Sequence, residues 1–239
     1  MQPDLRPVPH NDNHFGAEPT WQEATQVDGH RVLRNTYVLL ALTMIPTIIG
    51  AMLGMSTAYI VMKHPIITSL VMMAAAIGLQ FAIAANRDSV IGIGLLLLLT
   101  FMLGWWLGPL LNVALALKNG AALVGYAAGG TGIVMAVMAT IATTSKRDFS
   151  FLGNFLMVGM VVLLVAMLAN MFLQLPVLSL AISSAVILVF SLFLLHDLSR
   201  IVHGGEDNYI MATTGVYMSL FNIFANLLQL LMALTGERD

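Results

Sequence analysis

Long apolar stretches alternate with short polar breaks along most of the 239-residue chain. Each stretch reaches the ~20 residues that an α-helix needs to cross a hydrocarbon core about 30 Å thick. The breaks between them carry Lys, Arg, Asp, Asn, Gly or Pro, which commonly end helices at a membrane surface. The pattern predicts an all-α polytopic membrane protein with seven transmembrane helices, at 35–62, 65–85, 89–117, 120–145, 149–173, 176–195 and 208–234.

The N-terminal segment 1–30 differs from the rest of the chain. It holds four of the eight prolines and five acidic residues, and its apolar residues show no helical or strand period. A segment of this composition buries too little apolar surface to offset the entropy of ordering. It also lacks a basic start followed by an apolar core, so no cleavable signal peptide is predicted. We expect a disordered tail at 1–30, a seven-helix domain at 31–235 and a short C-terminal end at 236–239.

The overall composition supports the membrane assignment. Hydrophobic residues make up 59% and charged residues 9% of the chain, and the mean hydropathy is +0.88. Soluble domains carry about 25% charged residues. The net charge of −2 gives no reason to expect a nucleic-acid partner. Because there is no cysteine, disulfides and thiolate metal ligands are excluded. The expected surroundings are a lipid bilayer, and no cofactor is expected.

Basic residues are distributed unevenly between the two ends of the predicted spans. Six lie on the side of the N-terminus and three on the other side. They are Arg31, Arg34, Arg87, Lys146, Arg147 and Arg200 on the first side, and Lys63, Lys118 and Arg238 on the second. Since Lys and Arg are retained in cytoplasmic loops, we expect a cytoplasmic N-terminus. Seven spans then place the C-terminus on the opposite side.

Glycines recur four positions apart inside three of the predicted spans. This spacing puts both glycines on one helix face, where two backbones can approach closely in lipid. The pairs are Gly50 and Gly54, Gly104 and Gly108, and Gly125 and Gly129. We expect all six to serve helix packing.

The last predicted span carries a polar stripe. At about 100° per residue, its polar and small residues fall within an arc of roughly 80°. They are Asn208, Gly215, Ser219, Asn222, Asn226 and Gln229. Unpaired amides in hydrocarbon cost several kcal/mol each, so this face cannot point into lipid. Two interpretations remain open: hydrogen bonding between helices, or a hydrated path.

A cluster of charge follows the sixth span, in "HDLSRIVHGGEDNYI" from His196 to Ile210. Asp197 lies inside the helix that Gly204 is expected to end. Arg200 lies three residues on, on the same face, and an Asp197–Arg200 ion pair is the simplest arrangement. Asp197 could instead be a titratable carboxylate at the mouth of a path, and His196 could add pH sensitivity. No metal site is predicted here, because no signature spacing is present.

The sequence does not favour an enzyme. An aspartic intramembrane protease needs two carboxylates that share a proton, and Asp197 is the only acid near a span end with a candidate path beside it. Ser219 has no histidine in its own span and no Gly-x-Ser-x-Gly around it. No phosphate-binding loop is present.

Several longer motifs resemble those of a known family. They are "LRNTY" (33–37), "GPLLN" (108–112), "GGTG" (129–132), "KRDFSFLGNFL" (146–156), "FLQLP" (172–176), "DLSRIVHGGEDNYI" (197–210) and "VYMSLFNIF" (216–224). Together they are similar to the Bax inhibitor-1 family, and within it to the bacterial YccA-like branch. The resemblance covers about residues 30–235. It implies a central last helix wrapped by the other six.

The resemblance implies two functions that stay open. Characterised members of the family leak calcium in a pH-dependent way through two aspartates, one at the end of span six and one in span seven. The first corresponds to Asp197, but the second falls at Ser219, which cannot share a proton as an acid. The leak path would run from Asp197 and Arg200 along Ser219, Asn222 and Asn226. A calcium or proton leak is therefore the alternative.

The YccA-like branch implies a different role. Such proteins bind and restrain FtsH, a membrane-anchored AAA+ protease that degrades membrane proteins, and they are slowly degraded by it. A loose N-terminal tail such as 1–30 suits an unfoldase. We therefore expect a non-enzymatic modulator, and slow substrate, of FtsH in the bacterial inner membrane, which protects other membrane proteins from degradation.

Overall fold

The computed structural model describes residues 21–145 and 147–236, and this part of the chain is helical apart from short connections. The helices are α1 (Trp21–Ser56), α2 (Ala58–Lys63), α3 (Pro65–Ala85), α4 (Val90–Ala116), α5 (Gly120–Thr144), α6 (Leu152–Leu173), α7 (Pro176–Val202) and α8 (Tyr209–Gly236). Seven of them are long and apolar enough to cross a membrane, with α1 counted from Arg31. The all-α class and the seven predicted spans are confirmed.

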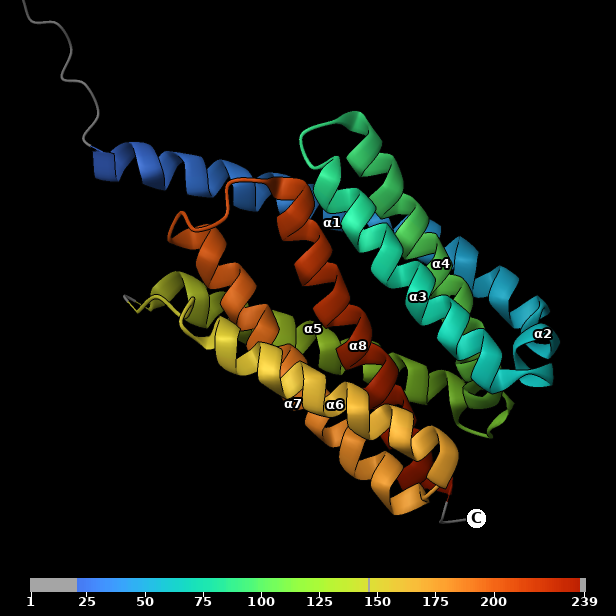
Figure 1. Cartoon of the computed structure of the whole chain (residues 1–239). Helices are drawn as coiled ribbons and strands as arrows, with labels where there is room; N and C mark the ends of the chain where they lie inside the picture. The colour runs from blue at the N-terminus through green and yellow to red at the C-terminus, as the bar shows by residue number, and fades with distance from the viewer. Residues whose placement is uncertain (1–20, 146, 237–239) are drawn as a thin grey trace, which may run out of the picture.

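The start of α1 differs from the predicted domain boundary. The backbone is helical from Trp21, so the last part of the segment predicted to be disordered continues the first span. Between Pro19 and Pro46 the sequence has no proline, and nothing in it forces the helix to stop at residue 31. The helix extends past the bundle at its N-terminal end (Figure 1). Residues 1–20 and 237–239 lie outside the described residues.

The last helix runs through the middle of the bundle. In Figure 1, α8 lies between the pair α3 and α4 on one side and the pair α6 and α7 on the other. It packs most extensively on α7, then on α5, α1 and α4, and only briefly on α3. The remaining span, α6, packs on α7. The bundle therefore surrounds α8 closely except along one side, between α3 and α6.

Four of the six paired glycines lie at one crossing, between α1 and α4. A Cβ atom added at Gly50 or Gly54 would collide with the backbone of Phe101 or Trp105. Added at Gly104 or Gly108, it would collide with the backbone of α1. Here the helices touch backbone to backbone, which only glycine permits.

The third glycine pair does not share this role within the chain. A Cβ atom at Gly125 or Gly129 would meet nothing within 4 Å. The expectation that both residues pack α5 against another helix of this chain is therefore wrong. Four-residue spacing establishes which residues share a face, but it does not determine whether that face meets a helix or lipid.

Candidate functional site

A short turn between α7 and α8 arranges the charged residues of the sequence cluster. Gly204 adopts a positive φ of 75°, a conformation that glycine takes without strain. The backbone N–H groups of Gly205 and Glu206 donate to the carbonyl of Arg200 at 2.7 and 3.2 Å. These bonds close the end of α7 and fold the turn back beside Arg200.

Arg200 pairs with Glu206 and not with Asp197. Its Nη2 donates to Oε2 of Glu206 at 3.1 Å and to the carbonyl of Gly205 at 3.0 Å. The predicted Asp197–Arg200 ion pair is wrong, because the turn after Gly204 brings a second acid closer to the guanidinium. Glu206 is the more buried partner, with 15% of its side chain exposed against 37% for Arg200.

Asp197 points toward α8, where Gly215 leaves room for its carboxylate. A methyl group at position 215 would lie 2.6 Å from Oδ2 of Asp197. Asp197 lies five residues before the end of α7, about 7 Å along the helix at 1.5 Å per residue. Among the hydrogen bonds and ion pairs between described residues, none involves this carboxylate. Its oxygens face a cavity instead.

The cavity beside Asp197 measures about 300 Å³. Helices α3, α6, α7 and α8 surround it, together with the turn at Glu206. Its polar lining includes Gln80, Asp197, Arg200, Glu206 and Ser219. The structure thus brings Ser219 into the same cavity as Asp197, the two positions at which the resemblance implies acids. No hydrogen bond between the two is found in the described part of the chain.

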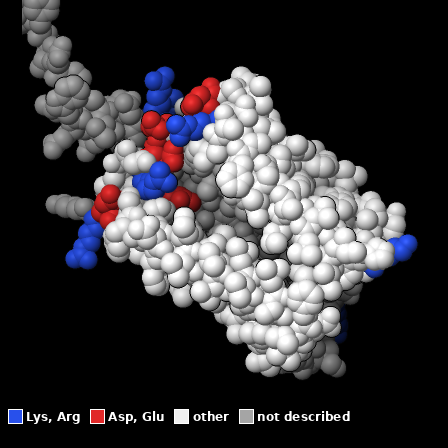
Figure 2. All heavy atoms as spheres, in the orientation of Figure 1, with Lys and Arg blue, Asp and Glu red and all other residues white. Residues whose placement is uncertain are grey.

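A second cavity of about 310 Å³ lies deeper in the bundle. It is lined mainly by methionine, leucine and aromatic side chains, with Ser69, Gln80 and Asn222 as its amide and hydroxyl groups. Four residues line both cavities, which therefore adjoin each other. These are Gln80, Met160, Phe190 and Met218. Figure 2 shows the molecule hollowed below the charged cluster. We call the two cavities together the α3–α6 cleft.

Two of the predicted site residues lie away from this cleft. His196 turns toward the start of α6, where its Nδ1 lies 3.3 Å from the carbonyl of Phe149 and its ring packs over Gly153. Asn226 donates from Nδ2 to the carbonyl of Asn222 at 2.9 Å, within its own helix. Neither residue lines either cavity.

Asn222 and Gln229, two other members of the polar stripe, make different contacts. Asn222 lines the deeper cavity while its Nδ2 donates to the carbonyl of Met218 at 2.8 Å. Gln229 donates to Oγ of Ser179 on α7 at 3.2 Å. The stripe therefore includes one hydrogen bond between helices, at Gln229, and two cavity-lining residues, Ser219 and Asn222. The hydrated path stays a prediction.

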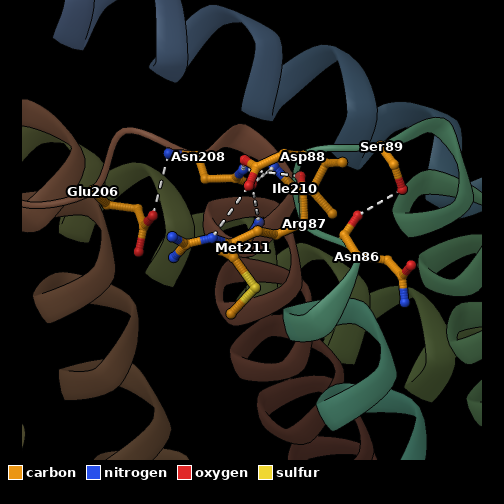
Figure 3. A network of polar contacts seen from close by, with 8 residues as sticks. All are labelled: Asn86, Arg87, Asp88, Ser89, Glu206, Asn208, Ile210 and Met211. Atoms are coloured by element: carbon orange, nitrogen blue, oxygen red, sulfur yellow. Dashed lines mark hydrogen bonds and ion pairs between the residues drawn. The ribbon is translucent and has the colours of Figure 1, made fainter.

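Asn208 is the N-terminal cap of α8 and ties it to a second loop (Figure 3). Its Oδ1 accepts the N–H groups of Ile210 and Met211 at 3.0 and 3.1 Å. Its Nδ2 donates to the carbonyl of Arg87 at 2.9 Å and to Oδ1 of Asp88 at 2.8 Å. The start of α8 is thus fixed to the α3–α4 connection.

Glu206 links Asn208, the cap of α8, to Arg200 through its two carboxylate oxygens. While Oε2 accepts from Arg200, Oε1 accepts the N–H of Asn208 at 3.2 Å. Sequence reasoning missed both Glu206 and Gln80 as site residues. Gln80 is the one amide side chain within the apolar run 65–85. A lone amide in an apolar span could have indicated that it faces a polar cavity.

A second polar cluster fixes the α5–α6 connection to α7. Oδ1 of Asp148 accepts from the hydroxyl and the N–H of Ser150 at 2.6 and 2.9 Å. The N–H of Phe149 donates to Oγ of Ser199 at 2.9 Å. The hydrogen bonds from Ser150, with smaller contributions from His203 and Ser199, lower the pKa of Asp148.

Charge is confined to the ends of the bundle. Figure 2 shows acidic and basic side chains gathered at the end where α7 meets α8, while the broad flank is uncharged. Across the described residues, no group of three His, Cys, Asp or Glu side chains could hold a metal ion. Two carboxylates line the cleft among the described residues. Glu206 pairs with Arg200, and Asp197 makes no ion pair.

Fold and site together define a polytopic α-helical membrane protein whose last helix borders an intramembrane cleft. Over residues 29–236 the chain matches the family model described as "Inhibitor of apoptosis-promoting Bax1". The chain belongs to this family, the Bax inhibitor-1 family.

Its relatives include bacterial membrane proteins. The "Modulator of FtsH protease YccA" of Escherichia coli K12 is 43% identical over 202 residues, which cover 84% of this chain and 90% of the relative. A membrane protein of Vibrio cholerae is 42% identical over 208 residues, 86% of this chain and 90% of the relative. A Pseudomonas aeruginosa protein is 39% identical over 217 residues, 90% and 94% of the two chains. The predicted family is confirmed, and the E. coli name describes a modulator.

Proposed function

We propose that this protein is a non-enzymatic modulator, and slow substrate, of the membrane protease FtsH, and that it protects other membrane proteins from degradation. The observation that carries the proposal is the 43% identity to the E. coli modulator over 90% of that protein's length. The match covers 202 residues, which are 84% of this chain. A shared fold alone would not carry function, so the proposal depends on this level of identity and not on the fold.

The proposed orientation puts the charged end of the bundle in the cytoplasm. Arg87, Arg147 and Arg200 lie in or beside the connections at the end where α1 enters the membrane. Retention of basic residues in the cytoplasm favours this end as the inner side of the bacterial inner membrane. The N-terminal segment then lies on the same side as the proposed cytoplasmic unfoldase of the protease, and the C-terminus lies opposite.

The arrangement of the cleft favours a role without catalysis. Asp197 and Ser219 line one cavity, and no histidine is among the described residues that line it. His196, the histidine next to Asp197, points to α6 instead. Nucleophilic catalysis needs a nucleophile, a base and an orienting group within hydrogen-bond reach.

The proposal is tested by a chase experiment. Full-length chain and a variant without residues 1–20 are expressed at equal abundance in cells that carry the protease, and the half-life of a labile membrane substrate is followed. Deleting 1–20 leaves α1, which begins at Trp21, uncut. We expect the full-length chain to prolong the half-life by about twofold or more, since a competing substrate occupies the protease by mass action. The truncated chain should not.

A matched control keeps the length of the segment and scrambles the order of residues 1–20. Protection by the scrambled chain would show that the segment acts only as a loose end for the unfoldase, in agreement with the proposal. An unchanged half-life with the full-length chain would overturn the modulator proposal.

The alternative function is a pH-dependent calcium or proton leak. Asp197 and Ser219 in one cavity favour it. Two observations weigh against it: Ser219 replaces an acid, and the deeper cavity is lined mostly by apolar side chains. Ion flux into liposomes that depends on Asp197, measured with Asp197→Asn as the comparison, would favour the leak over the modulator.

A further inference from the structure

The α3–α6 cleft has one polar end and one apolar end. The end near the α7–α8 turn carries Asp197, Arg200, Glu206 and Gln80. Along α8 the lining runs from Met211 down to Asn222, about 16 Å at 1.5 Å per residue. Each cavity, at about 300 and 310 Å³, reaches the volume of small-molecule sites. Such a shape fits an amphipathic molecule of one chain.

The polar end has one carboxyl group without a partner among the described residues. Of its three charged side chains, Arg200 and Glu206 neutralise each other in an ion pair at 3.1 Å. Asp197 is left without a hydrogen bond or ion pair from the described residues. A carboxylate removed from bulk water is costly unless a cation or donors meet it. The chemistry missing from this end is a cation with several N–H donors.

The apolar end suits a flexible hydrocarbon chain. Its lining includes five methionines and an indole: Met72, Met73, Met160, Met167, Met218 and Trp106. Methionine side chains adapt to the shape of an apolar ligand and are frequent on surfaces that bind varied partners. None of the described residues that line this cavity is charged.

The cleft is reached from the bilayer. Helix α3 packs chiefly on α4, and α6 packs on α7, so the cleft lies between two pairs of helices. The hollow opens on the uncharged flank of the molecule (Figure 2). A molecule dissolved in the membrane can therefore enter sideways with its chain in lipid.

We propose that the α3–α6 cleft binds an amphipathic primary amine, with its ammonium group at Asp197 and its single apolar chain in the methionine-lined cavity. The ammonium group donates three hydrogen bonds, for which the Asp197 carboxylate and the side-chain oxygens of Gln80 and Ser219 are the acceptors in the same cavity. This site is independent of the modulator function, because it concerns the membrane interior and not the N-terminal segment.

The test uses the full chain in nanodiscs of phosphatidylcholine. The probe is a primary amine with a chain of about ten carbons, long enough for the ~10 Å between Gly215 and Asn222 along α8, and brominated near its end. Bromine quenches tryptophan fluorescence on contact, and Trp106 lines the deeper cavity. We expect saturable quenching in the wild type and its loss in Trp106→Phe.

Matched controls isolate the charge. Asp197→Asn should weaken binding at least about tenfold, as expected when a charge-assisted contact is removed. Asp207→Asn removes the same charge from an exposed position in the neighbouring turn and should leave binding unchanged. Equal affinity of the amine for the wild type and a folded Asp197→Asn variant would overturn the proposal.

A second measurement needs no variant. The brominated alcohol and the brominated alkyl phosphate of the same chain length are titrated into the wild-type protein. Saturable binding of the phosphate as tight as that of the amine would contradict the proposal, since the charge preference would be absent. Adding lysophosphatidylethanolamine, a lipid with a single acyl chain, to the nanodiscs then identifies the source: competition assigns the site to a lipid headgroup amine, and its absence assigns it to a free amphiphile.

Discussion

Asp197 and Gly215 are a matched pair of residues on two helices. The carboxylate occupies the space that a side chain at 215 would need, at 2.6 Å from the position of a Cβ atom. Neither residue is informative alone: an acid near a span end suggests an ion pair, and a glycine suggests flexibility. Together they show that α7 and α8 meet around a carboxylate.

We predict that Gly215→Ala destabilises the protein by about 1–3 kcal/mol, the usual cost of overpacking. The free energy of unfolding in detergent measures this effect. Gly94→Ala is the control, because a Cβ atom there meets nothing within 4 Å. Adding Asp197→Ala to Gly215→Ala should recover part of the loss, because the collision is removed. Additive losses in this double-mutant cycle would contradict the contact.

Asp148 gives the protein a pH-dependent contribution outside the membrane spans. Hydrogen bonds from Ser150 lower the pKa of Asp148 in the folded state below the unfolded value of about 3.9. The stabilisation is therefore complete above about pH 5 and is lost as pH falls through the lower, folded pKa.

Asp148→Asn should accordingly flatten the fall of the melting temperature between about pH 5 and pH 2. The change should be small, because an exposed carboxylate is screened by water. Parallel slopes for the wild type and Asp148→Asn would refute the prediction.

At the scale of the element, α1 and α4 form the closest helix pair of the bundle. Gly50, Gly54, Gly104 and Gly108 let the two backbones touch, whereas Gly125 and Gly129 of α5 face outward. The same residue type in the same spacing thus has opposite surroundings.

We predict effects of opposite sign for one substitution at two glycines. Gly104→Ala should lower the free energy of unfolding by about 1–3 kcal/mol, because the methyl group meets the backbone at Thr47. Gly129→Ala should be neutral or stabilising by up to about 1 kcal/mol, since alanine favours the helix. Thermal unfolding of both variants in one detergent measures the difference, and equal effects would contradict it.

The transmembrane helices were predictable from the sequence, whereas most contacts between their side chains and the loops were not. A transmembrane helix is determined locally, by about twenty apolar residues between polar breaks, so all seven spans were found. Asn208 was placed in the polar stripe by its helical phase, yet it caps α8, because a helix start depends on which loop lies beside it. The partner of Arg200 was missed for the same reason: Glu206 approaches through a turn, and helical spacing does not include turns.

At the scale of the molecule, seven candidate spans lead us to expect the two ends of the chain on opposite sides of the membrane. We predict that alkaline phosphatase fused after Asp239 is active in the periplasm, whereas a fusion after Val202, at the end of α7, is inactive. Green fluorescent protein at the same two points should give the reverse pattern. Active phosphatase at both points would contradict the proposed orientation.

The central position of α8 also has a consequence for synthesis. Chains are made from the N-terminus, so the helix that the other spans surround is the last to leave the ribosome. Until then, Asp197 lacks Gly215 of α8 beside it. Thr47 likewise lacks the Tyr217 hydroxyl, which lies 2.8 Å from its Oγ1 in the finished protein. An unfinished chain can therefore form the α1–α4 pair but lacks the helix on which α7, α5 and α1 pack, so we expect the bundle to close only when α8 is complete.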